Sequence, residues 1–115
     1  MRRDAEYLRD ILEASDAVKR FLAGVDRTEF ERDELRQGAV VHRLTVIGEA
    51  AAKLPDALRA RAPGVDWRRV VAFRNLVVHA YFAIDWRVVW MVAIRDLPVL
   101  RRETEALLRG LEDGR

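Results

Sequence analysis

Apolar residues recur at intervals of three and four positions along most of the chain, and this spacing restricts the possible folds more than any other feature of the sequence. In the first such segment, from Asp4 to about Ala23, they are Leu8, Ile11, Leu12, Val18 and Leu22. The spacing puts these side chains on one stripe of a helix, which Gly24 is expected to end. The sequence contains no strand-like alternation, repeat or low-complexity run, so the pattern predicts an all-α protein.

A second long helix is predicted from near Asp33 to Leu54, closed by Pro55 and Asp56. The residues of its apolar face are Val40, Val41, Leu44, Ile47, Gly48, Ala51 and Leu54. Gly48 and the alanines at 50–52 also form a run of small residues. Such a run allows another helix, from this chain or from a symmetry mate, to approach closely. Packing within one core is the simpler interpretation for any single alanine.

Local signals mark the connections between helices. Thr28 and Glu31 have the spacing of a capping box, which predicts a short helical turn around Phe30. Pro63-Gly64-Val65-Asp66 has the composition of a turn followed by a helix N-cap. Asp85 is expected to cap the last helical segment.

Two further helices are predicted in the second half of the chain. The third runs from Trp67 to about Val78, and the residues that it offers to a core are Val70, Val71, Phe73 and Val77. The fourth extends from Trp86 through Leu111, and Pro98 is expected to kink or split it because proline removes a backbone donor. The predicted fold is therefore of the four-helix-bundle type, with short connections and a kinked C-terminal helix.

Length and composition predict one soluble domain that spans residues 1–115. Hydrophobic residues make up 50% of the chain and charged residues 35%; they alternate finely, which excludes a disordered polymer. The apolar stretches are too short to cross a bilayer. The amino terminus, Met1-Arg2-Arg3-Asp4, begins with charges and lacks the apolar region of a signal peptide. We therefore expect a cytoplasmic protein with no membrane association.

The chain has no cysteine, and its only histidines are His42 and His79. This composition excludes a disulfide framework, a thiolate nucleophile and a Cys-ligated or His-rich metal site. It also excludes a di-metal carboxylate bundle, because neither histidine has a Glu three positions before it. With 21 basic against 19 acidic residues the net charge is only +2, so the sequence pI of about 9.5 is weak support for RNA binding. Any catalysis must come from oxygen, imidazole or guanidinium groups, and no cofactor or metal is expected.

Four side chains that could take part in catalysis fall within one eight-residue segment, Arg74-Asn75-Leu76-Val77-Val78-His79-Ala80-Tyr81. Arg74 and His79 are separated by five positions, about 140° around an ideal helix, so they would not share a face of an undisturbed helix. His79 is therefore expected where the helix is ending. There the macrodipole favours the imidazolium, which suits a general acid or base near neutral pH, while Arg74 would supply a fixed positive charge.

Cleavage of RNA needs a group that accepts the 2′-hydroxyl proton, a group that protonates the leaving 5′-oxygen, and a cation beside the phosphate. One histidine and one arginine fall short, whereas two copies around a two-fold axis would supply both proton-transfer groups and two guanidinium charges. This chemistry predicts a homodimer with a composite site. The spacing alone leaves a plainer interpretation open, in which His79 caps a helix, Arg74 and Asn75 form a surface pair, and Tyr81 is half buried.

The same eight residues resemble the Arg-x-x-x-x-His-x-Tyr motif of the HepT-like toxins, which are metal-independent ribonucleases of the HEPN superfamily. They include the Asn that often follows the Arg in such ribonucleases. Other segments are similar to the family in the same order and at matching distances, so the resemblance covers nearly the whole chain. These segments are Val46-Ile47-Gly48-Glu49-Ala50-Ala51, Val65-Asp66-Trp67, Tyr81-Phe82-Ala83-Ile84-Asp85 and Asp96-Leu97-Pro98-Val99-Leu100.

The resemblance implies a HEPN-like fold and a toxin that cleaves tRNA or mRNA, with Arg74 and His79 as catalytic residues and Asn75 in support. It also implies a partner, a minimal nucleotidyltransferase antitoxin of the MntA type, which transfers AMP from ATP onto Tyr81. The added bulk and negative charge would block the RNA phosphate position. ATP and Mg²⁺ would then belong to the partner. The alternative is a non-catalytic helical subunit of a nucleotidyltransferase complex, in which the same side chains form a docking or nucleotide-binding surface.

Several other assignments stay open. Glu49 lies on the helix expected to face the motif, where it could orient Arg74 or His79 or form a plain interhelical salt bridge, and Arg43 shares this ambiguity. His42, beside the apolar stripe, is most simply a packing residue. The arginines that could line an RNA path, or could equally be solvated surface, are Arg59, Arg61, Arg68, Arg69, Arg87, Arg101 and Arg102.

Overall fold

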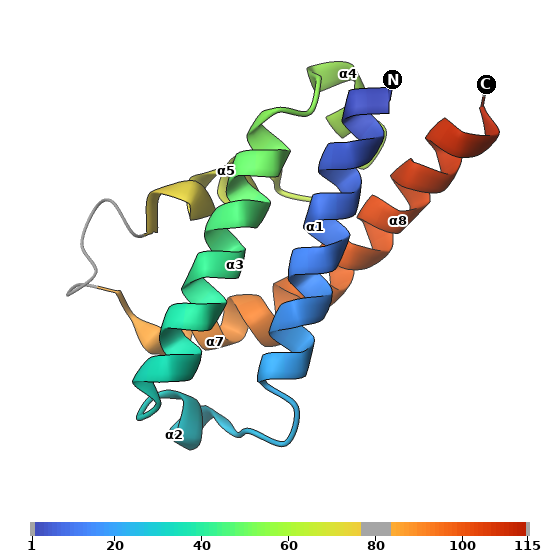
Figure 1. The fold of residues 1–115 in the computed structure, drawn as a ribbon. Coiled ribbons are helices and arrows are strands. Elements are labelled where there is room, and N and C mark those ends of the chain that lie inside the picture. Colours follow the sequence, from blue (N-terminus) through green and yellow to red (C-terminus); the bar gives the residue numbers. More distant parts are fainter. Residues whose placement is uncertain (1, 77–83, 115) are drawn as a thin grey trace.

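Two long antiparallel helices, α1 (Arg2–Phe21) and α3 (Glu34–Ala52), lie side by side in the computed structural model, which describes residues 2–76 and 84–114 (Figure 1). The predicted stripe of α1 is the face that packs inward, since Leu8, Ile11, Val18 and Leu22 are all buried. α1 ends at Phe21, and Gly24, with φ +74°, turns the chain in a conformation that glycine adopts without strain. The predicted first helix and its glycine stop are confirmed.

The connection between these helices contains α2 (Arg27–Phe30), a single helical turn. The predicted turn is present, but the capping box assigned to Thr28 and Glu31 is wrong. Asp26 is the N-cap, and its Oδ1 accepts a hydrogen bond from the Glu29 N–H at 2.8 Å. Asp26 and Glu29 have the same capping spacing two positions earlier, and the short aspartate side chain is itself a strong N-cap.

Phe30, the last residue of α2, is fully buried and anchors the connection to the C-terminal half. Its ring lies edge-on to Trp86 with the centroids 6.0 Å apart, and 5.7 Å from the ring of Trp90. Aromatic pairs at these separations stabilise packing beyond the area that they bury. The short helix therefore closes one end of the bundle.

Asp33 caps α3 by accepting a hydrogen bond from the Arg36 N–H at 3.1 Å. α3 ends at Ala52, close to the predicted end. Pro55 and the residue after it were expected only to close this helix, but Pro55 is also the N-cap of a short helix, α4 (Asp56–Arg59). A four-residue helix has no room for an amphipathic period, so periodicity could not reveal it.

The helix that carries the start of the motif tightens in its described part, which the sequence did not predict. α5 (Trp67–Ala72) begins at the predicted cap, where Asp66 Oδ1 accepts a hydrogen bond from the Arg69 N–H at 3.2 Å. The α-helix ends at Ala72 and continues as a 3₁₀ turn, η1 (Phe73–Asn75). The rest of the predicted helix, from residue 77 to residue 78, lies outside the described residues.

The C-terminal helical segment is broken, as predicted. α7 (Trp86–Met91) begins at its predicted cap, Asp85, and passes into a π-helical turn, η3 (Val92–Asp96), and then into α8 (Leu97–Asp113). Pro98 has no N–H to donate to the preceding turn, which accounts for the wider turn just before it. The break thus precedes the proline, and α8 runs slightly past Leu111.

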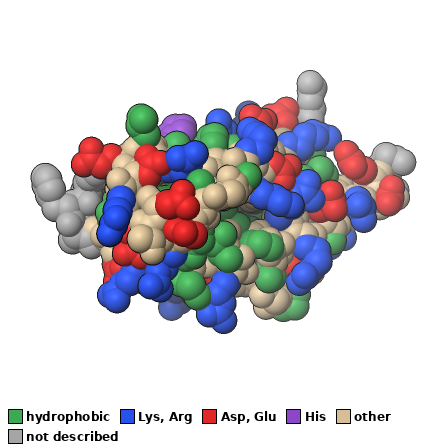
Figure 2. All heavy atoms as spheres, turned by 90° about the horizontal axis from the view of Figure 1, so that it is seen from below, with side chains coloured by type: hydrophobic (Ala, Val, Ile, Leu, Met, Phe, Trp, Pro, Cys, Tyr) green, Lys and Arg blue, Asp and Glu red, His purple; other side chains and the backbone are tan. Residues whose placement is uncertain are grey.

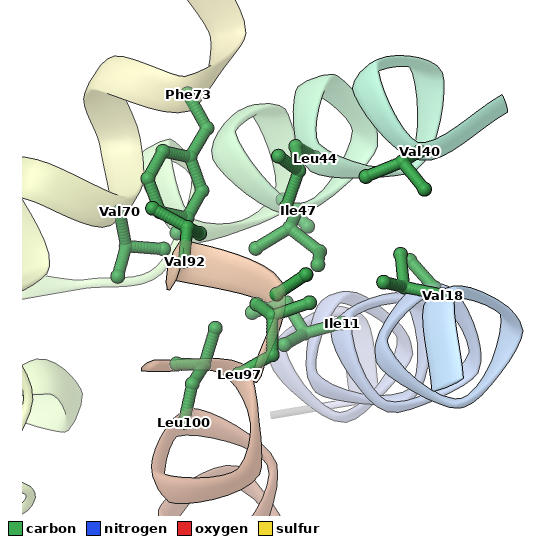
Figure 3. Close-up of a cluster of buried hydrophobic side chains, with 14 of the residues drawn as sticks. Ile11, Val18, Val40, Leu44, Ile47, Val70, Phe73, Val92, Leu97 and Leu100 are labelled. Carbon is green, nitrogen blue, oxygen red and sulfur yellow. The ribbon is translucent and has the colours of Figure 1, made fainter. Parts of the chain in front are cut away.

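One core joins these elements (Figure 3). The labelled side chains come from α1, α3, α5, η1, η3 and α8, and are Ile11, Val18, Val40, Leu44, Ile47, Val70, Phe73, Val92, Leu97 and Leu100. None of the described residues lies in a β-strand. The prediction of an all-α, four-helix-bundle-type, HEPN-like fold with a broken C-terminal helix is confirmed. In the described part of the chain, no helix combines the length and the apolar character needed to cross a bilayer.

Candidate active site

Arg74 and Asn75 lie on η1, and both side chains are exposed. Within the described residues, neither side chain has a hydrogen bond or an ion pair. No described side chain therefore competes with an anion from solution for the Arg74 guanidinium. His79 and Tyr81 lie outside the described residues, so their predicted places beside Arg74 stay predictions.

The backbone of η1 lies directly on α3 at Gly48. A Cβ atom on Gly48 would be 2.4 Å from the Arg74 backbone N and 3.0 Å from the Val71 carbonyl oxygen. The expected close approach at the run of small residues is therefore present, and the approaching element belongs to the same chain. The sequence placed Gly48 on the apolar face and in the run of small residues, but it did not show which element approaches there.

Three residues of α3 that the sequence singled out face different surroundings. Glu49 is exposed and forms no ion pair with Arg74 in the described part of the chain. The Arg43 guanidinium carbon lies 5.7 Å from the centroid of the Phe21 ring, so Arg43 packs toward the end of α1. The prediction that His42 is a packing residue is wrong, because His42 is exposed; it is one position, about 100°, beyond the buried stripe.

Most of the arginines proposed to line an RNA path are engaged in ion pairs. The pairs are Arg59 with Asp56, Arg69 with Asp96, Arg87 with Asp85, Arg101 with Asp16 and Glu105, and Arg102 with Glu103. Arg61 and Arg68 have no ion pair among the described residues. Arg68 and Arg69 both lie on α5. Of the two, only Arg68 lacks a carboxylate partner among the described residues.

Asp85, which starts α7, is held in its ionised form. Hydrogen bonds from the Arg87 side chain and from the Arg87 backbone N–H lower the pKa of Asp85 below its usual value. The carboxylate caps α7 by accepting the backbone bond at 3.0 Å.

Within residues 2–76 and 84–114, no group of three His, Cys, Asp or Glu side chains is placed to hold a metal ion.

A hollow of about 290 Å³ lies beside the motif helix, between α5 and the start of α8. Phe73, Val70 and Leu97 line it, and Arg69 pairs with Asp96 at 3.0 Å at its edge.

Figure 2 shows the lower end of the molecule, where hydrophobic side chains gather in the middle of the face and charged side chains of both signs surround them. The exposed apolar side chains of α7 and η3 are Val88, Met91 and Ile94.

The described residues thus form an all-α bundle that presents Arg74 and Asn75 to solvent on η1. Residues 11–107 match the family described as ribonuclease HepT-like, and the chain belongs to this family. It is 34% identical over 102 residues to a Thermococcus cleftensis protein named "Probable ribonuclease HepT", covering 89% of this chain and 93% of that protein. It is also 34% identical over 99 residues to "Putative RNase MJ1380" of Methanocaldococcus jannaschii, covering 86% of this chain and 91% of that protein. No solved structure matches the chain significantly.

Proposed function

We propose that this chain is the toxin of a toxin–antitoxin pair, a cytoplasmic metal-independent ribonuclease in which Arg74 and His79 cleave RNA. The observation that carries the proposal is the state of Arg74. Its side chain is exposed and without a carboxylate partner among the described residues, although arginines on both sides of the motif are paired. A guanidinium kept free in this way can bind a phosphate bidentately. Membership of a ribonuclease family supplies the reaction class.

In the proposed reaction, the ribose 2′-oxygen attacks the adjacent phosphorus and the bond from phosphorus to the 5′-oxygen breaks. The products are a 2′,3′-cyclic phosphate and a 5′-hydroxyl end. His79 of one copy accepts the 2′-hydroxyl proton, and His79 of a second copy donates a proton to the leaving oxygen. The two Arg74 guanidinium groups offset the charge that develops on the phosphate. This division of roles requires a homodimer.

Exposed apolar side chains support an association between copies. Val88, Met91 and Ile94 are 52%, 37% and 47% exposed, and they follow closely in the chain after the motif. Apolar side chains gathered on a surface are typical of contact faces. A two-fold contact that includes this face would supply the second set of catalytic groups.

The proposed antitoxin is a minimal nucleotidyltransferase that modifies Tyr81. The Tyr81 oxygen attacks the α-phosphorus of ATP, pyrophosphate leaves, and the tyrosine proton passes to solvent, which leaves AMP on the side chain. AMP carries a negative charge and a nucleoside into the space where RNA would bind. Asn75 and Glu49 are the proposed supporting residues; Asn75 lies on η1, and Glu49 follows Gly48 on α3.

The test is to express the chain without its partner, confirm by mass that Tyr81 is unmodified, and incubate it with total RNA in EDTA beside His79→Ala. We expect the parent to cleave RNA and leave 2′,3′-cyclic phosphate ends, and the variant to be inactive. Intact RNA with folded, unmodified parent protein would instead favour the non-catalytic subunit of a nucleotidyltransferase complex. Equal cleavage by both proteins would remove His79 from the mechanism.

A further inference from the structure

Gly48 differs from Gly64 and Gly110 in what surrounds it. Around Gly64, in the turn before α5, nothing lies within 4 Å of an added Cβ. At Gly110 the neighbour at 2.7 Å is the end of the flexible Arg61 side chain. At Gly48 the three nearest atoms are all backbone atoms of η1 and α5: the Arg74 N at 2.4 Å, the Val71 oxygen at 3.0 Å and the Arg74 Cα at 3.1 Å. Backbone atoms cannot swing aside as a side chain can, so only hydrogen fits at this position.

Among the described elements, α3 is the one that η1 contacts most. Of its three residues only Phe73 is buried, while Arg74 and Asn75 are exposed and form no hydrogen bond among the described residues. α3, in contrast, is anchored on both sides of Gly48, since Ile47, Ala50 and Ala51 are buried. The direct contact with α3 therefore sets the position of the backbone from which the Arg74 side chain extends.

We propose that Gly48 is a positioning residue for the Arg74 guanidinium, an inference that rests on the proposed role of Arg74. A methyl group at position 48 would push η1 outward by about 1 Å before ordinary van der Waals contact is restored. A shift of this size at a group that binds the reacting phosphate lowers a rate by about 100-fold. The start of α5, where Asp66 caps the helix, would keep its place.

The closing experiment compares Gly48→Ala with Gly64→Ala, the same substitution in open space. We expect kcat for RNA cleavage to fall about 100-fold in Gly48→Ala with KM changed less than about threefold, and both constants to stay at the parental values in Gly64→Ala. Circular dichroism and the Tm show the folded fraction of each protein. A folded Gly48→Ala protein with parental kcat would overturn the inference while leaving the proposed function intact.

Guanidinium rescue separates positioning from a general structural effect. Arg74→Ala should recover cleavage when guanidinium chloride is added at non-denaturing concentration. Gly48→Ala/Arg74→Ala should recover to the same rate, because a free guanidinium ion can bind wherever η1 lies relative to α3. A much lower rescued rate in the double variant would show that Gly48 acts on more than Arg74 and would refute the inference. If the parent shows no cleavage that depends on His79, the proposed function fails, and this inference fails with it.

Phe73→Leu serves if Gly48→Ala does not fold. This substitution loosens the only buried anchor of η1 and creates no overlap at Gly48. Because the contact at Gly48 is intact in this variant, we expect kcat and KM within about threefold of the parental values. A fall in kcat of about tenfold or more in a folded Phe73→Leu protein would show that Phe73, not the contact at Gly48, positions Arg74, and would overturn the inference.

Discussion

The paired helices α1 and α3 and the segments that carry the motif differ in how their positions are determined. α1 and α3 have 20 and 19 residues and bury apolar stripes against each other; α1 also packs on α8, and α3 on α5 and η1. The motif region is a succession of short pieces, with six residues in α5, three in η1, six in α7 and five in η3. A short helix has little propensity of its own, so each of these pieces depends on its caps and on the surface beneath it.

This difference separates stability from activity. Of the nine largest fully buried side chains, seven belong to α1 and α3, while the motif region presents Arg74 and Asn75 to solvent. Substitutions in α1 and α3 should therefore alter the free energy of unfolding with little effect on the rate of the folded enzyme. Substitutions in the motif region should lower the rate with little effect on the free energy of unfolding.

The strongest contrast is expected between Ile11→Ala and Arg74→Ala. Ile11 is fully buried in α1, and its truncation should lower the free energy of unfolding by about 3 kcal/mol, measured by urea denaturation. Arg74→Ala should lower kcat for RNA cleavage by about 100-fold or more and leave the Tm near the parental value. Leu35→Ala, at a position 88% exposed, is the surface control for Ile11. A similar loss of stability in Arg74→Ala would break the proposed separation.

Two N-caps allow a finer comparison. Asp66 and Asp33 each accept a backbone hydrogen bond from the residue three positions on, one at the start of six-residue α5 and the other at the start of 19-residue α3. Asp66→Ala should lower the Tm by roughly 5 °C and also lower kcat, because α5 leads directly into η1. Asp33→Ala should lower the Tm without changing kcat. Equal kcat in both folded variants would show that η1 is held independently of α5.

The smallest expected effect concerns Asp16, which ties α1 to α8 through Arg101 at 2.8 Å. Hydrogen bonding to Arg101, more than any other cause, lowers the pKa of Asp16. A lowered carboxyl pKa contributes stability above the pKa of the unfolded chain, and this contribution is lost as the pH falls through the folded pKa. Asp16→Asn should therefore destabilise by about 0.5 kcal/mol at pH 7, because the pair is partly exposed, and the difference should shrink as the pH falls below about 4.

Asp10 is the control for this pH series, because its pKa is shifted in the opposite direction to that of Asp16. Partial desolvation, followed by repulsion from Glu13 and Glu6, raises the pKa of Asp10. Its ionised form is therefore unfavourable in the folded chain above that pKa, and Asp10→Asn should stabilise the protein at pH 7, with the gain disappearing on acidification. Urea denaturation across the pH range measures both variants. The same sign of change in the two variants would contradict the assigned causes.

Local signals in the sequence were sufficient for most of the fold. The spacing of Leu8, Ile11 and Val18 predicted α1, the carboxylates of Asp66 and Asp85 predicted two helix starts, and Pro98 predicted the break in the last helix. Periodicity did not predict α4, because one helical turn carries no period. It placed His42 beside the core, but the position faces solvent.

The sequence alone determined the helices, most of their ends, the family and the identity of the motif, because these depend on residue type and spacing along a single segment. Only the tertiary structure decided which arginines are neutralised by a carboxylate and that η1 rests on α3. The contact between Gly48 and Arg74 joins residues 26 positions apart in the chain, and it depends on where two separate helices pack. No local pattern records that distance, which is why a glycine assigned to a helix face proved to lie directly beneath the backbone of the candidate active site.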